Sequence, residues 1–193
     1  MNKLTRDDLL KLEDYASQRA AFRTRVLAHK QARKLHVGPH LTLLFEDRLT
    51  VQYQIQEMLR VERIFEAAGI QDELDTYNAL IPDGSNLKAT MLIEFPDPEE
   101  RARKLVELHG IERVVSLVVG DLAPVVAIAD EDLERSTDEK TSAVHFLRFE
   151  LSAEHAAQFK RSANVMLRVD HPVYTHAVTL PENVRKALAE DLD

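Results

Sequence analysis

The segment from Phe45 to Glu66 is the stretch that most constrains how this chain can fold. At about 100° of rotation per residue, its apolar residues share one broad helical face, as packing against a core requires. Glu62 projects near the middle of that face, and Glu66 lies beside it. Alternating glutamines between residues 51 and 55 also fit a strand, but the helical period continues for longer. We therefore predict a helix that ends at Gly69.

The two glutamates on this face need a partner. A carboxylate buried alone is costly, so each must carry a proton, bind a cation or form an ion pair. An ion pair with a basic helix or with a second subunit is one way to satisfy them. Metal ligation or acid–base chemistry is the other, because buried carboxylates have displaced pKa values.

One long basic helix, or two helices with a kink between them, is predicted before this segment, from Arg6 to about Leu35, because the stretch contains neither Pro nor Gly. Residues 18–36 carry six basic residues and no acidic residue, in a chain whose net charge is −8. Arg19, Arg23 and Lys30 would lie along one side of the helix as a ridge. The acidic balance makes nucleic acid an unlikely partner. The ridge is predicted either to pair with the chain's own acids or to bind an anionic partner.

Strand signals dominate the second half of the chain. Apolar runs rich in β-branched residues follow one another from Lys88 onward, with short helical stretches between them. The runs 114–119 and 124–129 bracket a Gly-Asp turn and are predicted as a hairpin. The polar stretch 71–86 is predicted as a long loop.

These signals define one fold class. A chain of 193 residues with 45% apolar composition can bury one substantial core, so we predict a single domain over residues 1–193. Its class is α+β, with long N-terminal helices over residues 1–70. Residues 86–193 are predicted to add a mainly antiparallel sheet of about five strands, with interspersed short helices.

His145 is the second candidate for chemistry. Alternation along its strand places it on the same face as Leu147 and Phe149, toward the core. It is predicted either as a hydrogen-bonded core histidine or as a ligand or proton-transfer group. Glu94, near the end of another strand, is its companion candidate. A metal ion, if bound, would be held by Glu62, Glu66 and His145.

Composition excludes several classes of site. The chain has no Cys, which rules out disulfides, thiolate metal sites and a cysteine nucleophile. No apolar run approaches the roughly 20 residues needed to cross a bilayer, and the first residues lack the apolar segment of a signal peptide. We therefore expect a cytoplasmic protein with no membrane partner.

Three segments, at residues 45–66, 70–97 and 127–151, together resemble the bacterial domain-of-unknown-function family 3501 over essentially the whole chain. The resemblance carries no established activity. It implies an association with rubrerythrin-like and iron–sulfur redox proteins. Polar residues inside the three segments include Glu57, Glu62, Asn86, Lys88, Glu94, Lys140 and His145.

Two functions fit these observations, and the sequence indicates no reaction. The first is an accessory factor of a metal or oxidative-stress system, with a redox or iron–sulfur protein partner. It would bind a divalent metal or a small anion between the helix and the sheet. The second is a non-enzymatic protein–protein interaction module that forms a homodimer. The candidate binding residues are Glu62, Glu66, Glu94, His145, Asn86, Lys88, Arg19, Arg23 and Lys30.

Overall fold

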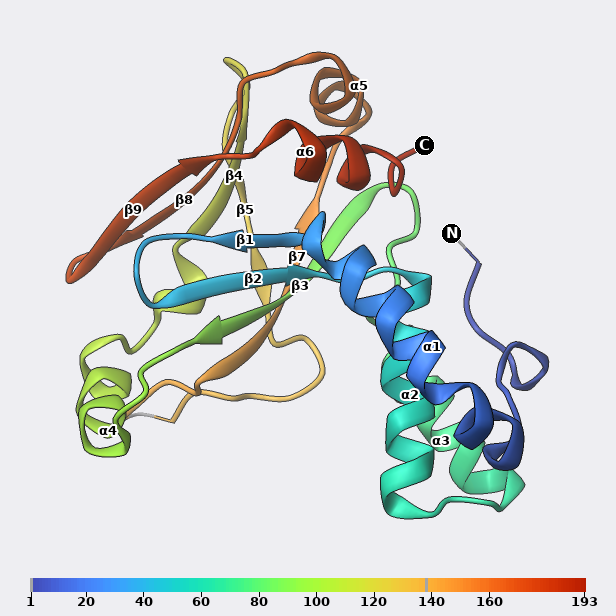
Figure 1. The fold of residues 1–193 in the computed structure, drawn as a ribbon. Coiled ribbons are helices and arrows are strands. Elements are labelled where there is room, and N and C mark those ends of the chain that lie inside the picture. Colours follow the sequence, from blue (N-terminus) through green and yellow to red (C-terminus); the bar gives the residue numbers. More distant parts are fainter. Residues whose placement is uncertain (1, 138) are drawn as a thin grey trace.

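The computed structural model describes residues 2–137 and 139–193, which form a helical part beside two antiparallel sheets (Figure 1). The helices are α1 (Leu12–Gln31), α2 (Arg48–Glu62), α3 (Ala67–Asn78), α4 (Pro98–Glu107), α5 (Ala153–Arg161) and α6 (Glu182–Ala189). Short 3-10 turns occupy Arg6–Asp8 and Ile111–Arg113. No helix in the described ranges combines the length and apolarity that crossing a bilayer demands.

The α+β class is confirmed, but the strands form two sheets rather than one sheet of about five strands. In spatial order, the five-stranded sheet contains β1 (Lys34–His36), β2 (Leu41–Phe45), β3 (Asn86–Ile93), β7 (Val144–Glu150) and β6 (Ile128–Ala129). The four-stranded sheet contains β5 (Val125–Val126), β4 (Val115–Val119), β8 (Val165–His171) and β9 (Tyr174–Thr179). All strand pairs within the two sheets are antiparallel.

The apolar run 124–129 joins the two sheets. Its first half, β5, pairs with β4, which confirms the predicted hairpin. The Ala127 amide then donates to the Val115 carbonyl at 2.8 Å, and the chain continues as β6 beside β7 of the other sheet. A short apolar run does not specify its neighbour, because sheet hydrogen bonds are made by the backbone. The single strand predicted over residues 124–129 is therefore two short strands, β5 and β6.

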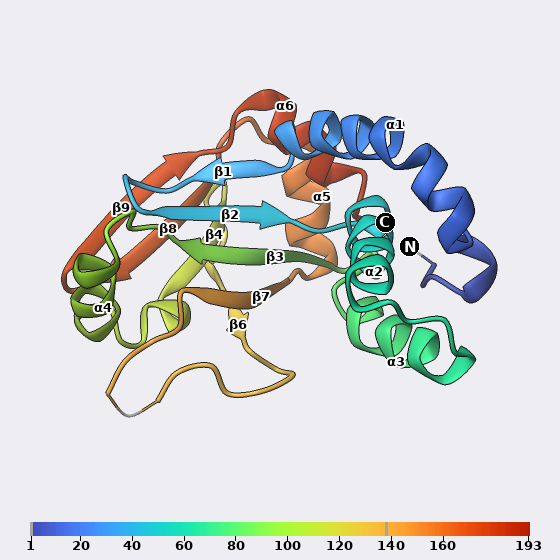
Figure 2. The ribbon, with the colours of Figure 1, turned by 60° about the horizontal axis from the view of Figure 1, so that its bottom comes forward.

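The two sheets, whose arrangement Figure 2 shows, both contribute side chains to a single apolar core. Leu43, Met91 and Leu147 from the five-stranded sheet belong to the same cluster as Leu117 and Leu167 from the four-stranded sheet. Each is fully or almost fully buried. The alternation of inward apolar residues along the strands accounts for this core.

The helical part has its own small core. Val51, Ile55 and Leu59 of α2 pack with Leu74 of α3, as the helical period predicts. The predicted helix is confirmed over this length, but it ends at Glu62, because Arg63 adopts a left-handed conformation with φ of 55°.

The predicted loop over 71–86 is wrong for its first half, since Gln71–Asn78 belongs to α3. The expected terminator Gly69 lies inside that helix. Polar residues fill most of α3, so its helical signal is weak, and the packing of Leu74 and the buried amide of Asn78 determine it.

A buried arginine fixes the point where α2 leaves the sheet. Arg33, after α1, donates to the main-chain carbonyls of Phe45 at 3.2 Å, Glu46 at 3.3 Å and Ala187 at 3.3 Å. It also pairs with the buried carboxylate of Asp191 near the C-terminus. The end of α1, the end of β2 and the C-terminal helix are therefore tied together at one point.

Candidate functional site

The two glutamates that the helical period predicted to be buried are on the surface. Glu62 is the last residue of α2, and Glu66 precedes the first residue of α3; both are exposed. The helix α2 ends at Glu62, so its apolar face does not extend to Phe65 as predicted. Phe65 itself is 64% exposed. Neither carboxylate needs a buried counter-ion, which corrects the expectation that a metal or the basic ridge satisfies them.

Glu57 instead receives the ion pair expected for Glu62. Arg19 of α1 donates two parallel hydrogen bonds of 2.8 Å to its carboxylate, and Arg60 adds bonds of 3.3 and 3.1 Å. The hydroxyl of buried Tyr15 donates to the same carboxylate at 2.7 Å. The hydrogen bond from Arg19 is the largest cause that holds the pKa of Glu57 far below its usual value. Glu57 thus fastens α1 to α2.

His145 is fully buried and hydrogen-bonded through both ring nitrogens. Its Nδ1 lies 2.6 Å from a carboxylate oxygen of Asp130. Its Nε2 lies 2.8 Å from the Thr141 hydroxyl and 3.0 Å from the Ser142 carbonyl. Both ring nitrogens therefore have hydrogen-bond partners inside the protein. His145 thus has the geometry of the hydrogen-bonded core histidine.

This buried network continues to a cavity. The Thr141 hydroxyl donates to Glu112 at 3.2 Å, and Ser136 donates to the other oxygen of Glu112 at 3.0 Å. Glu112, Ser136 and Asp130 line a cavity of about 330 Å³. Among residues 2–137 and 139–193, no three His, Asp or Glu side chains come together as ligands for a metal ion. The structure therefore does not bring Glu62, Glu66 and His145 together.

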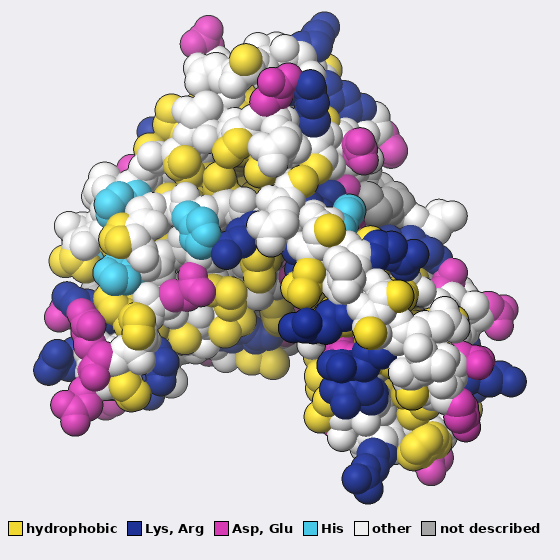
Figure 3. Space-filling view, viewed as in Figure 1, with side chains coloured by type: hydrophobic (Ala, Val, Ile, Leu, Met, Phe, Trp, Pro, Cys, Tyr) yellow, Lys and Arg dark blue, Asp and Glu magenta, His cyan; other side chains and the backbone are white. Residues whose placement is uncertain are grey.

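A larger groove lies where the helical part meets the five-stranded sheet, and we call it the joint groove. It has two lobes of about 400 Å³ and about 260 Å³, which share the side chains of Tyr77, Leu80 and Phe146. The surface is notched between these two parts of the molecule, and several Lys and Arg side chains border the notch (Figure 3). Pockets in this size range, at the junction of two parts of a protein, are the usual places for small ligands.

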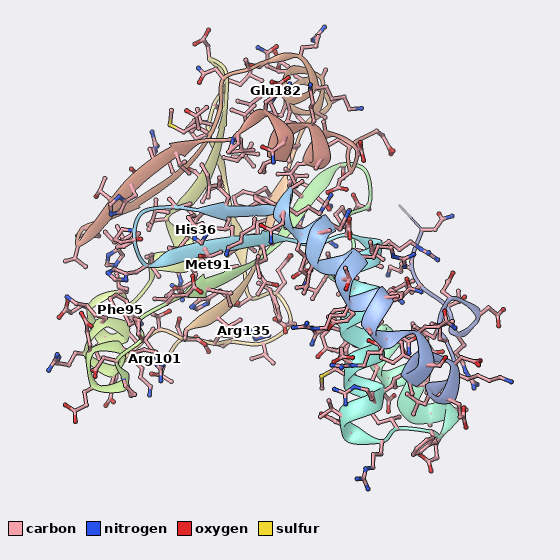
Figure 4. All side chains as sticks on the ribbon, in the orientation of Figure 1. His36, Met91, Phe95, Arg101, Arg135 and Glu182 are labelled. Atoms are coloured by element: carbon pink, nitrogen blue, oxygen red, sulfur yellow. The ribbon has the colours of Figure 1, made fainter. Side chains whose placement is uncertain are left out.

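The larger lobe has an apolar lining and a charged rim. Leu80, Leu133 and Phe146 contribute apolar surface, and Lys88 and Arg148 are the basic residues that line it. The Arg135 guanidinium lies 4.5 Å from the centre of the Phe146 ring and is labelled in this region in Figure 4. Strand alternation explains the arrangement, because Phe146 and Arg148 point to the face opposite His145.

Lys30 lines the smaller lobe, so two of the predicted binding residues, Lys30 and Lys88, meet at one groove. Its ammonium lies 6.0 Å from the centre of the Tyr53 ring. Asn86 is buried and donates to Glu150 at 3.3 Å, at the end of the sheet beside this groove. Glu94 is exposed at the opposite end of β3, where it accepts a hydrogen bond of 2.5 Å from Thr42, and Arg23 is exposed on α1.

No contacts were predicted from the sequence for several residues that shape these sites. Glu57 lies one position from the buried face of α2, and only the approach of α1 gives it partners. Asp130 follows an apolar run, and its left-handed φ of 52° is unusual for a residue with a side chain. Tyr77 and Leu80 fell in the predicted loop. No local pattern identifies a pair such as Tyr77 and Phe146, because 69 positions separate them in the sequence.

Comparison with known proteins agrees with this fold. A crystal structure from Burkholderia pseudomallei K96243, described as a novel protein of unknown function, has a TM-score of 0.95 and 54% sequence identity, with complete coverage of both chains. A search of curated proteins finds no match. Residues 3–192 match the family described as "Protein of unknown function (DUF3501)". This chain belongs to that family.

Proposed function

We propose that this protein binds a small organic molecule with an apolar body in the joint groove. The observation that carries the proposal is the larger lobe, where apolar side chains from α3 and β7 face each other across about 400 Å³. Burying the apolar body of a ligand there would remove exposed apolar surface from water on both partners.

The position of the groove also supports ligand binding, because both of its walls are held in place by packed side chains. Its walls come from α3 and the two residues 79–80 that follow it on one side, and from β3, β7 and residues 131–133 on the other. Ile81 and Leu74 hold α3 in the helical core, while Leu147 belongs to the core between the sheets. Each wall is therefore supported by its own packed interior, and the cavity is formed before a ligand arrives.

A neutral fluorescent probe tests this proposal. N-phenyl-1-naphthylamine is apolar and brightens when it leaves water, so titration should give saturable binding with one site per chain. Thr76→Trp places a large side chain on the α3 wall and should weaken this binding about tenfold or more.

Gln71→Trp is the matched control, because Gln71 is exposed on the same helix and does not line the groove. It should bind the probe as the wild type does. Equal affinity of Thr76→Trp and the wild type would show that the probe binds elsewhere and would refute the proposal. Absence of saturable binding to the wild type would also refute it.

The accessory role in a metal or oxidative-stress system keeps its basis in family resemblance, as does the redox or iron–sulfur partner. The homodimer remains a prediction from the sequence, in which the long N-terminal helix supplies the surface for the partner. Elemental analysis of the purified protein tests the metal version, and light scattering tests the dimer. A metal-free protein whose thermal stability does not change when divalent ions are added would refute the metal-binding role. A strictly monomeric protein would refute the homodimer.

A further inference from the structure

Lys88 lines the larger lobe of the joint groove without an acidic partner among the described residues. Its ammonium donates to the main-chain carbonyls of Ala79 at 2.6 Å and Ile81 at 3.0 Å. An ammonium has three N–H donors, so these two bonds leave one for another acceptor. Over residues 2–137 and 139–193, no carboxylate forms an ion pair with Lys88.

Three acidic residues line the same lobe; Asp75 accepts a hydrogen bond from Gln71 at 2.8 Å, and the other two are paired with arginines. Glu131 accepts two bonds from Arg148, at 2.7 and 2.8 Å. Asp132 accepts one from Arg135 at 2.6 Å. Arg148 also pairs with Glu150 at the edge of the sheet. These contacts occupy the carboxylates of Glu131 and Asp132, so Lys88 is the basic residue lining the larger lobe that has no ion-pair partner within the described ranges.

Burial makes this charge costly. Lys88 is half-buried beside apolar side chains, and its loss of hydration lowers the pKa of the ammonium. The carbonyl partners offset part of that cost but supply no opposite charge. An anionic group beside the ammonium would form a charge-assisted hydrogen bond in a partly desolvated place, where such bonds are strong.

We propose that the ligand of the joint groove is an organic anion whose carboxylate, sulfonate or phosphate binds the ammonium of Lys88. The inference rests on the proposed function and narrows it to one chemical class. The apolar body lies against Leu80, Leu133 and Phe146, which line the same lobe as Lys88. A neutral molecule of the same shape satisfies the apolar wall but leaves the ammonium without an opposite charge.

Two fluorescent probes with the same aromatic skeleton measure how much a negative charge on the ligand adds to its affinity. 1-Anilinonaphthalene-8-sulfonate differs from N-phenyl-1-naphthylamine chiefly by its sulfonate. The wild type should bind the anionic probe about tenfold or more tightly than the neutral one, as expected for a hydrogen bond to a charged group. The two probes should compete for the same site.

Lys88→Met should remove this preference while retaining affinity for the neutral probe, and Lys88→Arg should restore it. Lys88→Gln is the second uncharged variant, for use if the methionine variant fails to fold, because its amide can still donate to the carbonyl of Ala79 or Ile81. Lys30→Met, in the smaller lobe, is the charge control and should keep the preference.

The outcomes separate the two proposals. If the neutral probe binds in the groove and the sulfonate brings no gain in the wild type, Lys88 does not recognise an anion, although the groove remains a binding site. A preference that survives both Lys88→Met and Lys88→Gln, or that is lost in Lys30→Met, overturns the inference in the same way. If neither probe binds, both proposals fall.

Discussion

Replacing Glu57 by alanine should destabilise the protein, although the helical period of the sequence makes Glu62 look like the important acid. Glu57 accepts hydrogen bonds from Arg19, Arg60 and the hydroxyl of Tyr15. Its removal leaves the Tyr15 hydroxyl without an acceptor in a residue that is fully buried. Glu62 is exposed and should tolerate the same change.

The expected loss of stability in Glu57→Ala is set mainly by the buried hydroxyl of Tyr15. An unsatisfied buried hydroxyl costs about 1–3 kcal/mol. The two arginine side chains are more than a third exposed, so their pairing with Glu57 adds little in water. We therefore expect Glu57→Ala to lower the free energy of unfolding by about 2 kcal/mol. For a protein of this length, that loss lowers the melting temperature by about 4–8 °C.

Urea denaturation followed by circular dichroism measures this difference. Glu57→Gln should recover most of the loss, because its amide oxygen still accepts from Tyr15. Glu62→Ala should change the free energy of unfolding by less than about 0.5 kcal/mol, as surface substitutions generally do. Equal losses in Glu57→Ala and Glu62→Ala, or a Glu57→Gln variant as unstable as Glu57→Ala, would contradict this reasoning.

Three further predictions concern buried polar groups. His145→Leu removes the imidazole partner of Asp130, which keeps the Phe146 amide at 3.0 Å and Arg135 at 3.6 Å, and should cost about 1–3 kcal/mol in chemical denaturation. An unchanged free energy of unfolding would contradict this. Burial raises the pKa of Asp191 from 3.8 to about 6, so folding takes up a proton between these values. Relative to Asp191→Asn, the wild type should lose up to about 3 kcal/mol of stability as pH rises from 4 to 7, and a constant difference would contradict this. Asn78→Ala frees the amide and carbonyl of Leu4, and the Leu4 amide should then exchange hydrogen at least about tenfold faster.

Local patterns predicted much of the secondary structure. The helix α2, the strand β3 that begins the run of strand signals, and the strand β7 that carries His145 follow from apolar periods, which act within a few residues. The α+β class follows from their order along the chain. The long N-terminal helix was placed correctly only in part, because α1 ends at Gln31 and residues 34–36 form a strand.

The candidate site was predicted less well than the fold. Lys88 and Lys30 were named among nine candidates, and they do line the groove. Nothing in the sequence showed that Glu62 would end its helix and be exposed while Glu57 took the ion pair. That outcome depends on where α1 crosses α2, and ion pairs between separate helices depend on packing rather than on spacing along one of them.

The sequence alone determined which segments are helical or extended, because side-chain periodicity and backbone preference are local properties. It also determined the family, since the resemblance extends through the whole chain. Tertiary structure alone decided that residues 125–129 divide between two sheets, and that polar α3 is a helix. It also decided that an unpaired ammonium lies beside an apolar groove. These features need backbone partners, burial and counter-charges from distant residues, and only the folded chain brings them together.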